Sequence, residues 1–220
     1  PVVVVVSALG KTTNALEFIV AAACKGDVES ANEQAAALEK QHIEYAKTIL
    51  DEKYHNDAIK ALNVFFTELQ WAIDDAATHE YDYTYDQVVC IGELLSTRIF
   101  AYYLAQHGMD VEWIDIRDIL RTDDTYRDAK VDNEYSEQQV QEKMMPLLKA
   151  GKSIVTQGFI GATSDNASTT LGREGSDYSA ALLAAWTKSS AVTIWKDVEG
   201  LKNADPKKFP NTVRIDAISY

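Results

Sequence analysis

A polar turn near residues 170–177 contains side chains that could do chemistry. It is made of Arg173, Glu174, Gly175, Ser176 and Asp177, and a run of small apolar residues follows. We predict that this run is helical. The free N–H groups and positive dipole end of a helix start attract anions. The Arg173 guanidinium adds a fork of donors that fits a carboxylate or a phosphate. The turn therefore predicts an anion site.

Two residues of this turn also have simpler interpretations. Arg173 could be a surface arginine that pairs with Asp165 or Glu174. Asp177 could be an acid in the first turn of a helix, where a negative charge contributes about 0.3–1 kcal/mol. For Asp177, the structural and the functional interpretation can hold together.

The elements around the turn predict an α/β fold. Residues 2–6 and 153–159 are apolar, strand-like runs, and we expect further strands at residues 111–116 and 191–195. Helical segments separate these runs, a pattern typical of a mostly parallel sheet covered on both faces. Ligands of such sheets bind at the carboxyl ends of the strands. We therefore expect the loops that follow the strands to form the site.

The helices are predicted from periodicity and breakers. Residues 11–24 form one helix, which Gly26 ends, and residues 27–78 form a helical excursion of two or three helices. We expect an aromatic loop at 81–85, one helix over 86–108 with Gly108 as its cap, a short strand at 128–131, and helices at 137–150 and 176–188.

Composition excludes several classes of function. The chain has 220 residues, 46% of them hydrophobic, and a net charge of −13. This predicts one globular domain and no nucleic-acid partner, because phosphate backbones require a basic surface. Cys24 and Cys90 form no CxxC pair, and the histidines lack metal-ligand spacing, so we expect no protein-bound metal. We also expect no membrane span, since no apolar run approaches about 18 residues.

Four segments in order resemble one family. They are VVVVVSALGKTTNAL, IGELLSTRIFAYYL, VTQGFIGATSDNASTTLGREGSDYSAALLAA and VTIWKDVEGLKNADP. Their order and spacing are similar to those of aspartate kinases of the amino acid kinase superfamily, and the resemblance is weakest between about residues 25 and 80. It implies a three-layer αβα sandwich with a mostly parallel central sheet. It also implies transfer of the γ-phosphoryl group of ATP to the side-chain carboxylate of L-aspartate.

The resemblance has wider implications. The product would be 4-phospho-L-aspartate, at the entry to lysine, threonine and methionine biosynthesis. Mg²⁺ is expected as a bridge between the ATP phosphates rather than as a protein-caged ion. The full-length protein is expected to be a cytoplasmic homo-oligomer.

The resemblance also implies roles for individual residues. Arg173, Glu174, Gly175 and Ser176 would hold aspartate, and Asp177 would orient catalytic lysines. Thr13 would touch the substrate, Ser7 would lie near the reacting phosphate, and Glu93 would meet the α-ammonium group of aspartate. Alternatives stay open, since Thr12 or Thr13 could be a helix cap, and Glu93 could be a first-turn acid or pair with Arg98.

The nucleotide loop departs from the family pattern. The resemblance assigns nucleotide contacts to Lys196, Asp197, Lys202 and Asp205. Many relatives have Ser or Thr in place of Lys196 and Tyr in place of Lys202. Many also have Gly in place of Glu174, whose negative charge is unfavourable beside an anion. A lysine cannot stack as a tyrosine does, although it can reach a phosphate.

Two family motifs would lie outside these residues. A KFGGTS-type strand would precede Pro1, and a GAKVLHP-type motif would follow Tyr220. We therefore expect residues 1–220 to be a partial catalytic domain, without regulatory ACT domains and inactive by itself. One alternative is an amino acid kinase with another acceptor, such as glutamate or acetylglutamate. Another is a non-catalytic module that binds aspartate or a nucleotide.

Overall fold

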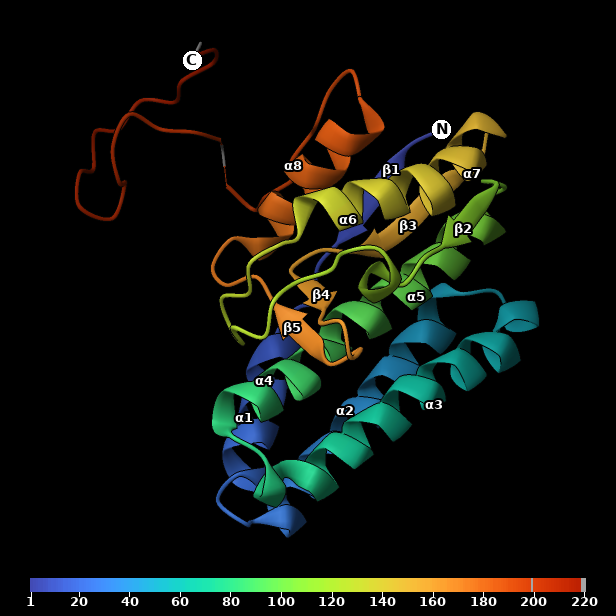
Figure 1. Ribbon diagram of the computed structural model, residues 1–220, viewed down its shortest axis with the longest axis vertical. Helices are drawn as coiled ribbons and strands as arrows, with labels where there is room; N and C mark the ends of the chain where they lie inside the picture. Colours follow the sequence, from blue (N-terminus) through green and yellow to red (C-terminus); the bar gives the residue numbers. More distant parts are fainter. Residues whose placement is uncertain (199, 219–220) are drawn as a thin grey trace. The chain divides into compact units, whose positions relative to one another are not determined.

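The computed structural model describes residues 1–198 and 200–218, in two compact units, residues 1–190 and 191–220. The first unit holds all the named helices and strands (Figure 1). Its sheet has three parallel strands in the order β1 (Val3–Val6), β3 (Ser153–Gln157) and β2 (Val111–Trp113). Val3 pairs with Ile154 in register, and β3 is buried throughout. The predicted parallel sheet is confirmed, with β3 at its centre.

Helices cover both faces of this sheet, as the three-layer prediction requires. α5 (Ile91–Gln106) contacts all three strands from one side. α7 (Met145–Lys149) contacts β3, and α8 (Gly175–Thr187) contacts β1, from the other side (Figure 1). α6 (Asn133–Gln139) continues through a π-helical turn, Val140–Met144, into α7.

The helical excursion consists of two long helices, as expected. α1 (Thr12–Ala23) packs on α2 (Val28–Ile49), which packs on α3 (Glu52–Asp75); a short 3₁₀ turn, η1 (Ala76–Thr78), follows. Leu62, Phe66, Leu69 and Ile73 recur at helical spacing on α3 and are buried. This periodicity explains why the excursion was predictable where the family resemblance is weakest.

Residues 81–85 are helical, so the predicted aromatic loop is wrong. They begin α4 (Tyr81–Val89). The Arg127 guanidinium lies 4.5 Å from the centre of the Tyr85 ring and donates to Asp82. These contacts stabilise a helical turn that local sequence does not favour. Cys90 is the one residue between α4 and α5, and its backbone is helical, so the predicted helix over 86–108 is confirmed as part of one span, Tyr81–Gln106, that begins earlier than expected.

The strands differ from the prediction in three further places. Residues 191–195 form no strand, because no neighbouring backbone pairs with them in the described part of the second unit. Residues 128–131 contribute only a single bridge, between Val131 and Thr122. An antiparallel hairpin, β4 (Ile160–Ala162) with β5 (Ser168–Thr170), was not predicted.

One span in the fold meets the length and composition of a membrane helix. It is Tyr81–Gln106, with a mean hydropathy of 1.4 over 18 residues. The expectation that no such run exists is therefore wrong. In this fold 67% of that window is buried, so its apolar side chains form the core beneath the sheet.

Candidate functional site

The carboxyl ends of β1 and β3 meet the start of α8 in one corner. Ser7, which follows β1, donates a hydrogen bond of 2.8 Å to Ser176 Oγ, 169 residues away. Gly158, which follows β3, lies so close that an added Cβ would be 2.7 Å from the Ser176 Cβ. The glycine therefore lets the first turn of α8 touch the sheet edge, as expected for a ligand site of a parallel sheet.

Glu93 projects into the same corner from the first turn of α5. Its side chain is only 3% exposed, and its Oε1 accepts a 3.2 Å hydrogen bond from the Ala8 N–H. Its Oε2 is buried and has no hydrogen-bond partner among the described residues. The Ser96 hydroxyl donates to the Ser7 carbonyl at 2.7 Å, which ties α5 to the same loop. Glu93 is thus held in place with one oxygen unused.

The environment of Glu93 favours its neutral form. Burial raises the pKa of this carboxyl to about 8, and the hydrogen bond from Ala8 offsets part of that rise. The alternative of an ion pair with Arg98 is wrong, because neither oxygen of Glu93 pairs with Arg98 in the described residues. The Arg98 guanidinium lies 4.7 Å from the centre of the Trp113 ring instead. A ligand with a positive group would supply the missing partner of Oε2.

The turn before α8 has a strained backbone at Glu174. Glu174 is the N-cap of α8 with a left-handed φ of 58°, and Gly172 has a φ of 74°. A side chain at a left-handed position costs about 1 kcal/mol or more, which a glycine avoids. Arg173 is exposed, and no ion pair joins it to Asp165 in the described part of the chain.

The threonines at the start of α1 have different surroundings. Lys11 is the N-cap and its side chain forms no cap bond, so neither Thr12 nor Thr13 caps the helix. The Thr12 hydroxyl turns inward and lies 3.4 Å from His42 Nε2. Thr13 is half-buried in the first turn of α1. Its contact with substrate stays a prediction.

The structure brings some of the predicted site residues together in the first unit, and the others belong to the second unit. Ser7, Glu93 and Ser176 converge, and Asp177 lies in the first turn of α8. Lys196, Asp197, Lys202 and Asp205 belong to the second unit. There the Asp205 carboxylate accepts from the Lys207 N–H at 2.9 Å. Their role in nucleotide binding stays a prediction.

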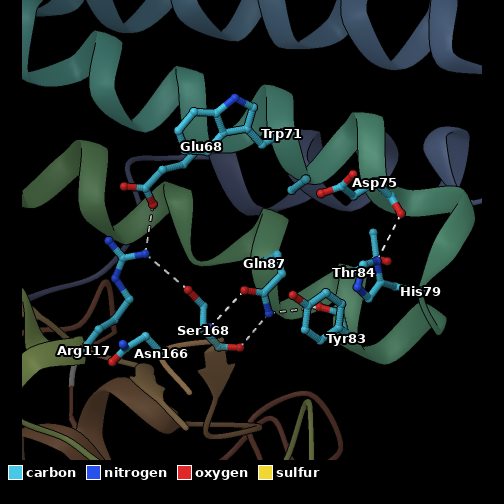
Figure 2. A pocket seen from close by; sticks show the side chains of 11 residues that line it. Glu68, Trp71, Asp75, His79, Tyr83, Thr84, Gln87, Arg117, Asn166 and Ser168 are labelled. Carbon is cyan, nitrogen blue, oxygen red and sulfur yellow. Dashed lines mark hydrogen bonds and ion pairs between the residues drawn. The ribbon is translucent and has the colours of Figure 1, made fainter. Parts of the chain in front are cut away.

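A pocket of about 240 Å³ lies away from this corner, between α3, α4 and the loop before β5 (Figure 2). It includes none of the predicted site residues. Arg117 lines it, but its guanidinium donates to Asp115, Glu68 and Ser168. Because Asp115 and Glu68 already balance this cation, the pocket offers no free charge for a phosphate.

The described residues contain no group of three or more metal-binding side chains.

The sequence analysis did not single out two residues that shape the corner, Gly158 and Ala8. A glycine directly after a buried strand signals a close approach of another element, so Gly158 was detectable. The role of the Ala8 backbone N–H could not be predicted from the sequence.

Comparison with known proteins adds a family to this geometry. The sequence model of the amino acid kinase family matches residues 1–220. A lysine-sensitive aspartokinase 3 from Escherichia coli (strain K12) is 39% identical over 135 residues, which cover 61% of this chain and 30% of the relative. A chloroplastic bifunctional aspartokinase/homoserine dehydrogenase 2 from Arabidopsis thaliana is 32% identical over 225 residues, which cover 99% of this chain and 24% of the relative.

Solved structures that match this chain are also aspartokinases. The E. coli aspartokinase III complex with lysine and aspartate is 32% identical, with a TM-score of 0.82, and the match covers 98% of this chain and 47% of that chain. The E. coli aspartokinase III complex with aspartate and ADP is 30% identical, with a TM-score of 0.78, and covers 97% and 46%. This chain thus spans a quarter to a half of the proteins that it resembles.

Proposed function

Since this chain belongs to the amino acid kinase family, we propose that the protein containing it transfers the γ-phosphoryl group of ATP to the side-chain carboxylate of L-aspartate. The observation that carries this proposal is the buried Glu93 Oε2 that has no partner in the described residues, beside Ser7 and Ser176. An amino acid substrate has the positive group that this oxygen lacks.

Each end of aspartate finds a complementary group in the corner. The α-ammonium group pairs with Glu93, and a carboxylate meets the exposed Arg173 guanidinium and the N–H groups at the start of α8. Such two-ended binding fixes the orientation of the acceptor, which is most of what an enzyme contributes to phosphoryl transfer. The hydroxyls of Ser7 and Ser176, which are hydrogen-bonded to each other, belong to the same corner.

The proposed reaction forms one bond to phosphorus and breaks another. An oxygen of the side-chain carboxylate forms a bond to the γ-phosphorus, and the bond from that phosphorus to the β–γ bridging oxygen breaks. The products are 4-phospho-L-aspartate and ADP. Mg²⁺ supplies positive charge through the phosphates. Within this chain, Asp177 is assigned to orient cationic groups, and Lys196, Asp197, Lys202 and Asp205 to contact the nucleotide.

Support for aspartate comes from the relatives, since the two E. coli structures contain aspartate and one also contains ADP. The product would enter lysine, threonine and methionine biosynthesis. A cytoplasmic homo-oligomer, expected from the resemblance, stays a prediction. Glutamate or acetylglutamate as acceptor, and binding without turnover, are the competing outcomes of the test.

Hydroxylamine trapping tests the reaction, because it converts an acyl phosphate into a coloured hydroxamate. The protein containing these residues is incubated with Mg-ATP and, in turn, L-aspartate, L-glutamate and N-acetylglutamate. We expect hydroxamate from L-aspartate alone, and its loss in Arg173→Ala. Hydroxamate from another acid would identify a different acceptor. Calorimetric binding of aspartate by a protein that forms no hydroxamate would identify a binding module.

A further inference from the structure

Two side chains of α4 take the place of a third strand along β5. The Gln87 amide donates to the Ser168 carbonyl at 2.8 Å and accepts from the Ser168 N–H at 2.9 Å. Asp86 Oδ2 accepts from the Thr170 N–H at 2.8 Å, and Asp86 Oδ1 accepts from the Thr170 hydroxyl at 2.7 Å. The other edge of β5 pairs with β4. The side chains of α4 therefore supply the hydrogen-bond partners for the edge of β5 that faces away from β4.

Asp86 also binds a second segment. Its Oδ2 accepts a 3.0 Å hydrogen bond from the Arg127 N–H, and the Thr170 carbonyl accepts from the Ala129 N–H at 3.0 Å. The Asp86 side chain is fully buried. One carboxylate therefore joins α4, the loop at residues 127–129 and the end of β5, with three donors in place.

The turn that carries Arg173 rests on this junction. Gly172 lies against the 127–128 backbone, where an added Cβ would be 3.3 Å from the Arg127 carbonyl and 3.1 Å from Asp128 Oδ1. Gly172 adopts its positive φ readily, but the left-handed conformation of Glu174 is uncommon for a residue with a side chain and must be held by its surroundings. The Asp86 bonds fix the chain immediately before them.

We propose that Asp86 is a positioning residue that holds the turn at 171–175 in the conformation that presents Arg173 to the substrate. It acts through Thr170 and the Arg127 backbone and does not touch the substrate itself. This inference rests on the proposed function, because it assigns aspartate binding to the turn. Nothing in the local sequence of α4 marks Asp86, since it is one acid among several near residues 80–86.

Three variants separate positioning from general stability. Asp86→Ala removes all three bonds, and the Arg127 side chain still ties its loop to α4 through Asp82. Asp86→Asn keeps an oxygen that can accept from both N–H groups. Gln87→Leu is the matched control, because it removes two bonds to the same strand at Ser168, farther from the turn.

Two readouts are needed, one of which does not depend on ligand. In Asp86→Ala we expect amide hydrogen exchange at residues 171–175 to accelerate and the Kd for L-aspartate to rise about tenfold or more. Asp86→Asn should stay within about threefold of the wild type, since one of its atoms still accepts. Gln87→Leu should leave the Kd within about twofold, because its bonds lie elsewhere.

The opposite results overturn the inference. In Asp86→Ala, these results are an unchanged rate of amide exchange at residues 171–175 or an unchanged Kd for L-aspartate. In Gln87→Leu, the contradicting result is a loss of aspartate affinity as large as that in Asp86→Ala. If Asp86→Ala does not fold, Thr170→Val decides, because it removes only the hydroxyl bond; unchanged exchange and affinity would then count against Asp86. A wild type that binds no aspartate refutes the proposed function, while the exchange measurement still decides whether Asp86 holds the turn.

Discussion

Aspartate binding should become tighter as pH rises, because Glu93 must lose its proton to meet the α-ammonium group. Burial raises the pKa of Glu93 to about 8. About one Glu93 in a hundred is then ionised at pH 6, and half are at pH 8. The apparent Kd is the intrinsic value divided by this fraction. It should therefore fall about fiftyfold from pH 6 to pH 8, which corresponds to about 2.3 kcal/mol.

Isothermal titration of the protein with L-aspartate at several pH values measures this slope, and buffers of different ionisation enthalpy report the released proton. The control is Glu93→Gln, which keeps an oxygen to accept from Ala8. It should bind with nearly constant affinity and approach the wild type at pH 6, where Glu93 is neutral. The neighbouring Cys90 thiol stays neutral throughout, since burial raises its pKa to about 12.

A wild-type Kd that is constant between pH 6 and pH 8 would refute the reasoning. A pH dependence that persists unchanged in Glu93→Gln would also refute it, because another group would then be responsible.

Three further outcomes follow from the same geometry. Gly158→Ala should weaken aspartate binding about tenfold or more in titration, since its Cβ would displace α8; Gly161→Ala, which meets Leu120 instead, should lose stability in urea unfolding with unchanged affinity. Glu174→Gly should raise the free energy of unfolding by up to about 1 kcal/mol by relieving the left-handed backbone; a decrease would contradict this. Burial raises the pKa of Asp86 to about 6, so the folded state binds its proton more tightly than the unfolded chain. Unfolding free energy should therefore fall from pH 4 to pH 6 by on the order of 1–3 kcal/mol more in the wild type than in Asp86→Asn, which keeps the decrease that the raised pKa of Glu93 causes.

Periodicity and breakers were enough to predict the central elements of the fold. The valine run became β1, the apolar run before Gly158 became β3, and spacing on α3 placed its buried face. The errors occur where contacts distant in sequence decide the structure. The turn at 81–85 is helical through Arg127, and β4 and β5 are too short to show alternation.

The candidate site, like the fold, could be predicted from the sequence only in part. Loop residues with distinctive chemistry, such as Arg173 and Glu93, could be selected from the sequence. Their arrangement could not, because the bond between Ser7 and Ser176 spans nearly the whole first unit. The unused oxygen of Glu93 and the junction at Asp86 depend on burial, which short polar segments do not reveal.

The most direct test of the central claim is a crystal structure of this protein with bound L-aspartate. We predict that the α-amino nitrogen lies within hydrogen-bond distance of Glu93 Oε2, about 2.7–3.2 Å, with a carboxylate against Arg173. Aspartate bound with its amino group turned away from Glu93, or bound only in the pocket lined by Arg117 and Glu68, would contradict the account.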